Sequence, residues 1–276
     1  MKAKGQPTPI GIDLHHADWL DAVATLAPAS IDLLYADLPF ATGSTKRTPP
    51  NAKRAGRTVN ASYADTFAGS DGFIGWLRPR LLATLPALRP TACILLHLDW
   101  RTSHHARLLL DDLLGPECFV NHLIWSYGLG GSSPRRFARK HDDILFYART
   151  PGNHYFDPPR VPTTSNLLRG KSKKMTDVLA IPSINNMARE RTGYPTQKPL
   201  ALLDVLVRAC SPAGGTVLDP CCGSGTTLVA ATLAGRKGIG IDRSAQAIAV
   251  ARKRIRQARP ASTTVVPKRG MQPGRA

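Results

Sequence analysis

Asp37, Leu38, Pro39 and Phe40 follow directly on an apolar run, Ile31 to Ala36, which is typical of a buried strand. The carboxylate of Asp37 is a hydrogen-bond acceptor, and Phe40 offers an aromatic face. Pro39 has a fixed φ and restricts the preceding residue to an extended conformation. The four residues therefore predict a stiffened turn at a strand end, which holds an acceptor and a stacking surface together.

A second candidate site lies in TVLDPCCGSGTTLVAA, residues 216–231, which reads as a strand, a glycine turn and a helix. Gly223 and Gly225 permit positive φ and the close approach of a ligand. A dinucleotide fingerprint would have a third glycine where this chain has Leu228, and a P-loop would have a lysine that is absent. Asp242 ends the next expected strand, where an acid accepts hydrogen bonds from ribose hydroxyls. The pattern favours a nucleoside cofactor such as S-adenosylmethionine over a plain α/β turn.

The elements that must position these residues alternate between strands and helices, which predicts an α/β domain with a largely parallel sheet. Pro79 and Pro86 interrupt one helical pattern. We expect strands at 31–37, 91–98, 119–127, 142–149, 215–220 and 237–242, and helices at 71–89, 103–115, 198–210, 225–235 and 244–259. One domain would span residues 1–257, with an insertion or recognition segment at 150–193, followed by a basic disordered tail at 258–276.

The charge of the chain is concentrated in three segments. Residues 41–60, 160–191 and 251–276 together account for the whole net charge of +18, so the rest of the chain is neutral. A neutral body that carries basic segments is typical of a protein with a polyanionic partner. The alternative is that the basic tail only aids solubility.

Composition excludes several classes of protein. No run of about 18 apolar residues exists, so no membrane span is expected, and the N-terminus lacks the apolar core of a secretory signal. The five cysteines, two of them adjacent at Cys221 and Cys222, form neither a disulfide framework nor paired zinc spacing. This favours a reduced, cytoplasmic protein without a metal site. His97 and Asp99 are expected to have buried hydrogen-bonding roles.

Three motifs in this order resemble the β-class of DNA methyltransferases that modify exocyclic amino groups. DLPF resembles their motif IV, YPTQKPLALLDVLV their motif X and LDPCCGSGTT their motif I, and the resemblance covers roughly residues 10–255. It implies a Rossmann-like S-adenosylmethionine-dependent methyltransferase fold, with a mostly parallel sheet and helices on both faces. It also implies double-stranded DNA as partner and a target base that is flipped out of the duplex.

The resemblance also assigns roles to residues. The carboxylate of Asp37 and the carbonyl of Leu38 would accept the two N–H groups of the amino group, while Pro39 stiffens the loop and Phe40 stacks on the base. The residues implied to bind the cofactor are Asp219, Cys221, Gly223, Gly225, Thr226 and Asp242, together with Thr196, Gln197 and Lys198 of motif X and Asp18.

In the same scheme the basic segments contact DNA. Residues 41–60 would close over the flipped nucleotide, and residues 150–193 would recognise the target sequence. The cations available for phosphate or guanine in this recognition segment are Arg160, Arg169, Lys171, Lys173, Lys174, Arg189 and Arg191.

Two departures from the family pattern leave alternatives open. Leu38 replaces the first proline of motif IV, which predicts a less rigid turn, and Cys221 stands where a phenylalanine is usual. Asp37 favours adenine N6 over cytosine N4 as the target. A catalytically weakened DNA-binding relative, or an enzyme acting on RNA or a small metabolite, would be the other readings. A homodimer, a partner restriction endonuclease and a location at the nucleoid are expectations from the resemblance alone.

Overall fold

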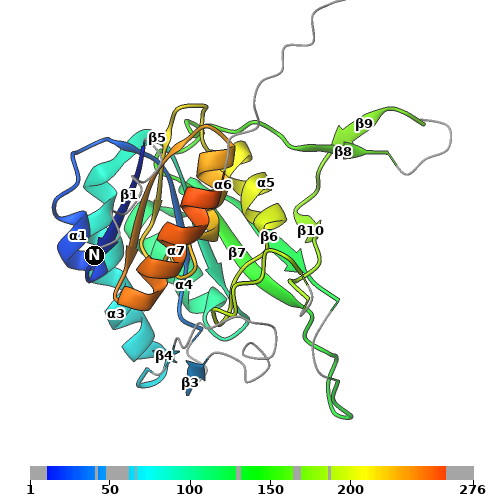
Figure 1. Cartoon of the computed structure of the whole chain (residues 1–276), viewed down its shortest axis with the longest axis horizontal. Coiled ribbons are helices and arrows are strands. Elements are labelled where there is room, and N and C mark those ends of the chain that lie inside the picture. The colour runs from blue at the N-terminus through cyan, green and yellow to red at the C-terminus, as the bar shows by residue number, and fades with distance from the viewer. Residues whose placement is uncertain are drawn as a thin grey trace, which may run out of the picture.

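The computed structural model describes residues 11–40, 43–47, 62–65, 67–128, 132–163, 169–185 and 188–258. Most of the basic segment 41–60, and residues 259–276 of the expected basic tail, lie outside these ranges. Figure 1 shows the arrangement of the elements.

An eight-stranded sheet forms the centre of the molecule, in the order β1-β12-β11-β2-β5-β7-β6-β10. Every neighbouring pair is parallel except the two pairs that contain β7. The strands are β1 (Ile12–His16), β2 (Ile31–Asp37), β5 (Leu88–Leu98), β6 (Phe119–Ser126), β7 (His141–Ala148), β10 (Val178–Ala180), β11 (Thr216–Asp219) and β12 (Lys237–Asp242). The expectation of a mostly parallel α/β sheet is confirmed.

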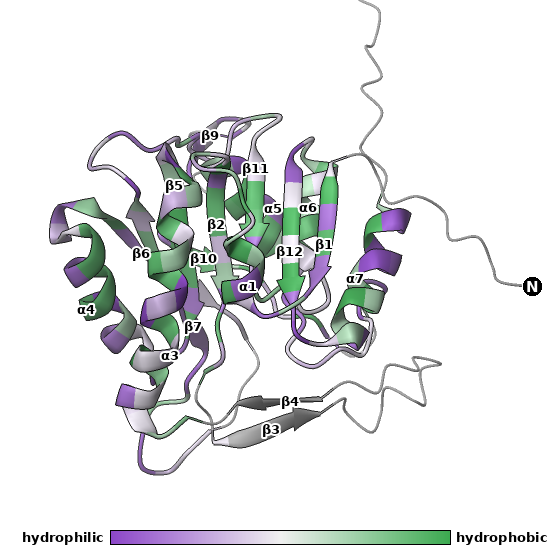
Figure 2. Ribbon diagram, turned by 90° about the vertical axis from the view of Figure 1, so that its left-hand side faces the viewer, coloured by the Kyte–Doolittle hydropathy of each residue, from purple (hydrophilic) through white to green (hydrophobic). Residues whose placement is uncertain are grey.

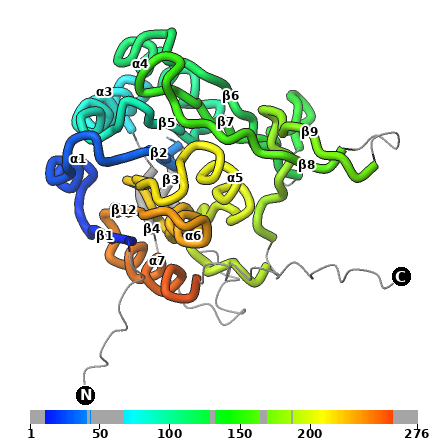
Figure 3. The backbone as a smooth tube through the Cα atoms, turned by 90° about the horizontal axis from the view of Figure 1, so that it is seen from above, coloured from blue at the N-terminus to red at the C-terminus, as the bar shows by residue number. Residues whose placement is uncertain are grey.

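Helices cover both faces of this sheet (Figure 3). On one face lie α1 (Trp19–Val23), α3 (Gly69–Thr84) and α4 (Ser103–Leu114), which share a core with the strands that includes Leu34 and Leu96. On the other face lie α5 (Leu200–Cys210), α6 (Thr226–Leu233) and α7 (Ala245–Gln257). Leu33 and Leu95 point to that second face, because successive side chains of a strand alternate. In Figure 2 the strands are largely hydrophobic, whereas α7 shows one hydrophobic and one hydrophilic side.

Two of the differences between the expected elements and the structure have a clear physical reason. Pro79 lies inside α3 and does not interrupt it, because Phe73, Leu77 and Leu81 are buried on one side of the helix and their packing outweighs the lost backbone hydrogen bond. The strand β1 was not expected, since its sequence, IDLHH, is too polar for a buried strand. It lies at the edge of the sheet, where polar residues are tolerated.

Different segments lie at the two ends of the parallel strands. The hairpin of β3 (Ser44–Arg47) and β4 (Ser62–Asp65) follows β2 at the carboxyl edge, the side of the sheet where the parallel strands end. The arm of β8 (Arg160–Pro162) and β9 (Ser172–Lys174) projects from the opposite edge, as Figures 1 and 2 show. The expected recognition segment is therefore divided. Its first part forms this arm near the end of α5, where the Asp157 amide donates to Ala209, and its last part returns beside β10 to the carboxyl edge.

Within the described ranges, no helix has both the length and the apolar composition that a membrane span requires.

Candidate active site

A cavity of about 750 Å³ opens at the carboxyl ends of β2, β11 and β12. It brings together thirteen of the fourteen residues that the sequence assigned to the site. Those thirteen are Asp18, Asp37, Leu38, Pro39, Phe40, Thr196, Gln197, Lys198, Asp219, Cys221, Gly223, Thr226 and Asp242. Gly225 does not line the cavity, because it faces α7, where an added Cβ would lie 2.7 Å from the Cβ of Ala251.

Asp37 is paired with Lys198 at one end of this cavity. The Nζ of Lys198 donates to Oδ1 of Asp37 over 2.5 Å, and the same ammonium lies 4.9 Å from the centre of the Phe40 ring. The side chain of Lys198 is 9% exposed and that of Asp37 is 22% exposed. The sequence placed Lys198 on the cofactor, but these contacts join it to the predicted catalytic turn.

The backbone of this turn is anchored by the neighbouring strand. Asp37 is the register partner of His97 in β5, and the Leu38 amide donates to the His97 carbonyl over 3.1 Å. The Leu38 side chain is buried in the core. A proline at this position would have no N–H to donate. The expectation that Leu38 loosens the turn therefore overlooked a hydrogen bond that only a non-proline residue can make.

A chain of buried polar groups lies behind the turn. The Tyr35 hydroxyl is 2.8 Å from Nδ1 of His97, whose Nε2 is 3.1 Å from Asp142. Asp142 also accepts from the Tyr127 hydroxyl over 2.9 Å. Burial alone would raise the pKa of Asp142, but the hydrogen bond and charge of His97 outweigh it, so its pKa lies below the usual value. Burial and the nearby carboxylates raise the pKa of Tyr35, which keeps its hydroxyl protonated.

The other end of the cavity is lined by the buried Asp219 and the partly buried Asp242, neither of which is paired with a lysine or arginine in the described structure. Burial raises the pKa of Asp219 to about 7, although the Cys221 amide donates to its carboxylate over 3.1 Å. Burial also raises the pKa of the Cys221 thiol well above its usual value, with a further contribution from Asp219. The thiol is therefore protonated and is not a nucleophile.

Asp242 holds the glycine turn in place. Its carboxylate accepts from the Gly223 amide over 2.9 Å and from the Ser244 amide over 2.8 Å, and burial raises its pKa. Gly223 has φ of +49°, and a Cβ there would lie 3.2 Å from the Tyr194 ring. A side chain at this position would therefore crowd the cavity wall.

The loop before α5 is shaped by Gln197. Its amide oxygen accepts from the backbone and hydroxyl of Thr192, and its nitrogen donates to the Glu190 carbonyl. Thr196 has φ of +57°, in the left-handed region. Gln197 thus fixes the loop that carries Lys198 to Asp37.

Two charged groups in the region have structural partners. Asp18 caps α1 through the Leu20 amide and accepts two hydrogen bonds from Arg80, each of 3.1 Å. Arg254, counted with the basic C-terminal segment, is largely buried and donates to Ser224 and Thr226. Burial lowers the pKa of Arg254 to about 10. Arg254 therefore supports the glycine turn and is not part of a polyanion-binding surface.

Comparison with known proteins identifies the family. The sequence model N6_N4_Mtase, described as DNA methylase, matches residues 31–253. This chain belongs to the N6/N4 family of DNA methylases. Such a methylase takes its methyl group from S-adenosylmethionine.

Two curated relatives show the extent of the similarity. The type II methyltransferase M.ScaI of Streptomyces caespitosus is 35% identical over 142 residues, which cover 46% of this chain and 47% of that protein. The chain thus spans about half the length of M.ScaI in this match. The DNA adenine methyltransferase YhdJ of Escherichia coli (strain K12) is 24% identical over 278 residues, which cover 92% of this chain and 87% of YhdJ.

A solved structure supports the fold. The cytosine-N4-specific PvuII DNA methyltransferase superposes with a TM-score of 0.63 at 16% identity, covering 90% of this chain and 87% of that one. At this identity the similarity concerns the fold of the methylase and not its target base.

The residues of the methylase cavity fit S-adenosylmethionine. This cofactor carries a cationic sulfonium, an ammonium and two ribose hydroxyls, and the cavity provides the carboxylates of Asp219 and Asp242. The missing Cβ of Gly223 leaves room beside the Tyr194 ring. Each carboxylate oxygen of Asp242 has a second lone pair, so both retain acceptor capacity.

Sequence reasoning missed several residues of the methylase site. Tyr35 precedes Asp37 by two residues and so points to the same side of β2, a signal that the alternation of strand side chains could have given. Arg80 lies in a helix that was expected to be interrupted, and only the fold brings it to Asp18. Tyr194, Trp19, Phe67 and Trp76 also line the cavity.

Proposed function

We propose that this methylase transfers a methyl group from S-adenosylmethionine to the exocyclic amino group of a base flipped out of double-stranded DNA, with adenine N6 as the favoured target. The observation that carries the proposal is the turn Asp37–Phe40, anchored by the His97 carbonyl at the mouth of a cavity whose other end is acidic.

The amino group of a nucleobase is a poor nucleophile, because its lone pair is delocalised into the ring. The Asp37 carboxylate and the Leu38 carbonyl accept its two N–H groups, which draws the nitrogen toward tetrahedral geometry and localises the lone pair. Phe40 stacks on the base and restores part of the stacking lost on flipping, roughly 1–3 kcal/mol. The base must displace Lys198 from Oδ1 of Asp37 or share that oxygen with it.

S-adenosylmethionine, when bound, supplies an electrophilic methyl group on its sulfonium. Asp219 and Asp242 would hold its cationic and hydroxyl groups at the ends of β11 and β12, next to the end of β2. Because both reactants are held on adjacent strands, orientation supplies several kcal/mol of the rate enhancement.

Target recognition is assigned to the part of the 150–193 segment that returns to the cavity edge. In this part, residues 175–185 and 188–193, Arg189 is exposed and available for DNA. The cytoplasm, at the nucleoid, is the compartment in which such a substrate is found. A homodimer and a partner restriction endonuclease remain predictions from the resemblance.

The second candidate target is cytosine N4, which the same turn would activate by the same contacts. Asp37 favours adenine, because cytosine-N4 enzymes of this family usually begin the motif with serine. The reading as a weakened DNA-binding relative rested on Leu38 alone, and the anchored Leu38 amide argues against it.

The test is to incubate the purified protein with S-adenosylmethionine and unmethylated mixed-sequence duplex DNA, digest the DNA to nucleosides, and identify the products by mass spectrometry. We expect N6-methyladenine. N4-methylcytosine would keep the mechanism and change the base. The absence of a methylated product on DNA, with cofactor binding intact, would contradict the proposal, and parallel RNA reactions would then test the remaining polymer.

A further inference from the structure

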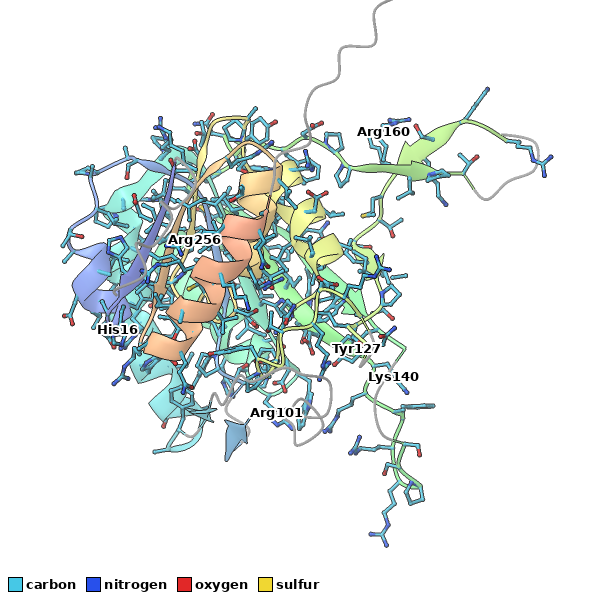
Figure 4. All side chains as sticks on the ribbon, in the orientation of Figure 1. His16, Arg101, Tyr127, Lys140, Arg160 and Arg256 are labelled. Atoms are coloured by element: carbon cyan, nitrogen blue, oxygen red, sulfur yellow. The ribbon has the colours of Figure 1, made fainter. Side chains whose placement is uncertain are left out.

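The segment between β6 and β7 leaves the sheet at the edge where the cavity opens. Because β6 runs parallel to β5 and β2 while β7 runs antiparallel to β5, the end of β6 and the start of β7 lie at the carboxyl edge. Residues 132–140 of this connection, here called the basic loop, project beyond that edge (Figure 1). Figure 4 shows Tyr127 and Lys140 at the base of the loop, on the side of the molecule where Arg101 lies.

The base of the basic loop is held by several contacts. The Tyr127 amide donates to the Lys140 carbonyl over 2.9 Å, and the Lys140 ammonium donates to the Gly128 carbonyl over 3.1 Å. Arg139 lies 3.5 Å from the ring centre of Trp100, which follows β5 at the same edge. The loop therefore leaves the body from a fixed base.

The tip of the loop combines positive charge with an exposed aromatic ring. Residues 132–140 contain Arg135, Arg136, Arg139 and Lys140 and no acid. Between these cations, Phe137 is 98% exposed, so its ring contributes almost nothing to the core. The loop therefore presents an aromatic ring on which a base could stack, directly beside cations that could bind phosphates.

Of the partners that such a surface fits, duplex DNA matches both features. Arginines bind phosphates and fix the register of a protein on the duplex. A phenylalanine can insert between base steps and partly unstack them, as apolar wedges of DNA-bending proteins do. A base that is flipped into the cavity leaves a gap in the stack, which such a ring can fill.

We propose that the basic loop docks duplex DNA beside the cavity, with Arg135 and Arg136 on phosphates and Phe137 inserted next to the flipped base. This inference rests on the proposed function for the nature of its partner. It assigns DNA contact to a segment that the charge analysis left out, because acids elsewhere balance its cations in the chain total.

The arm of β8 and β9 is the natural alternative, since it carries Lys171, Lys173 and Lys174. It projects from the amino edge of the sheet, however, and in Figure 4 Arg160 of the arm lies at the opposite end of the molecule from Arg101. Arg160 is also bound to the hydroxyl and carbonyl of Ser172. A duplex positioned to place a base in the cavity would therefore lie next to the basic loop and away from the arm.

The first experiment measures the affinity of the full chain for a labelled mixed-sequence duplex at several salt concentrations. We expect the double variant Arg135→Gln/Arg136→Gln to reduce the slope of log affinity against log salt by about 1.8, which corresponds to two phosphate contacts. The matched control, Lys173→Gln/Lys174→Gln on the arm, removes the same charge and should leave the slope unchanged. An unchanged slope in the loop variant, or a change confined to the arm variant, would overturn the proposal.

The second experiment tests the ring. Phe137→Ala should lower methyl transfer to duplex DNA roughly tenfold, the size expected for the loss of one base–aromatic stack, while Phe137→Trp retains it. Heat-denatured DNA of the same sequence needs no flipping, so Phe137→Ala should reduce transfer to it much less. Equal losses on both substrates, or none, would exclude insertion of the ring. If the wild-type protein methylates no DNA, the proposed function fails, and the salt slopes alone then decide whether the loop binds DNA.

Discussion

Asp37 and Asp219 end neighbouring strands of one sheet, β2 and β11, and line one cavity, yet their surroundings are opposite. Asp37 is partly exposed and bound to the ammonium of Lys198. Asp219 is 2% exposed, and burial raises its pKa to about 7. The end of the cavity that we propose to be catalytic thus contains its own cation. The end proposed to bind the cofactor instead presents an acid whose charge is not compensated by a lysine or arginine that the structure describes.

This difference indicates how the two ends work. A buried carboxylate without a cation is costly to ionise, and its ionisation becomes favourable when a cationic ligand binds beside it. A carboxylate that is already paired has a fixed direction and can serve as a preorganised acceptor. In the proposed mechanism, Asp219 gains a counter-charge only when the cationic cofactor binds. The carboxylate of Asp37 is already oriented by Lys198 before the base enters.

Asp37→Ala should have the largest effect. It removes one of the two acceptors of the amino group, so methyl transfer should fall a hundredfold or more, as when one stabilising hydrogen-bond partner is removed from a transition state. Methylated nucleosides counted by mass spectrometry give the rate, and calorimetry gives cofactor binding, which should change little. Unchanged methylation would remove Asp37 from the mechanism.

Lys198→Met tests which end of the cavity Lys198 belongs to. If it orients Asp37, as the 2.5 Å contact indicates, kcat should fall about tenfold while the Kd of S-adenosylmethionine changes less than about twofold. Single-turnover rates and calorimetry separate the two. A raised Kd with unchanged kcat would show that Lys198 binds the cofactor, as the sequence predicted.

Binding of the cofactor should depend on pH through Asp219. Below pH 7 Asp219 is protonated in the ligand-free cavity, so binding a cation must release a proton. Affinity for S-adenosylmethionine should therefore rise up to roughly fivefold from pH 6 to 7 and level off above about pH 8. In Asp219→Asn this dependence should vanish, whereas Asp13→Asn, an exposed aspartate of β1, should retain it. Affinity that is flat with pH in the wild-type protein would refute this account.

The same group affects stability in the opposite direction. Its pKa in the folded protein lies above the usual value of about 3.9, so the folded state binds the proton more tightly than the unfolded chain does. The free energy of unfolding of the ligand-free protein should therefore fall as pH rises from about 4 to 7. Denaturant titrations of the wild-type protein and Asp219→Asn across this range measure that loss.

Many of the residues that line the cavity were predictable from local pattern, because each motif places a strand end and a turn within a few residues. Asp37 and Asp242 each end a strand of a parallel sheet, and the ends of parallel strands meet at one edge. The fold class could be predicted for the same reason, because the alternation of strands and helices is a local pattern. The polar edge strand β1 could not be predicted, since it is defined by pairing with β12 and not by its own sequence.

What the sequence could not give is the partner of each side chain. The pairing of Lys198 with Asp37 joins residues 161 positions apart in the chain, and Arg80 reaches Asp18 across 62. Charge summed over segments also misled. It grouped Arg254, which donates hydrogen bonds to Ser224 and Thr226, with the basic C-terminal segment, and it left out the basic loop. Burial and strand direction, which decide what a charge can contact, come only from the three-dimensional arrangement.

Leu38→Pro should have the smallest effect on methyl transfer, and it examines how the turn that carries Asp37 is held. Proline is the usual residue of the family here, but it has no N–H for the His97 carbonyl, which would be left without this donor in a buried strand. The free energy of unfolding should fall by about 1–3 kcal/mol. Leu38→Met keeps both the N–H and the volume, so it should cost less than about 1.5 kcal/mol. Urea titrations of the three proteins measure the difference. If Leu38→Pro were as stable as the wild type, the hydrogen bond from β5 would not be what fixes the turn, and the preorganisation of Asp37 would have to come from Lys198 alone.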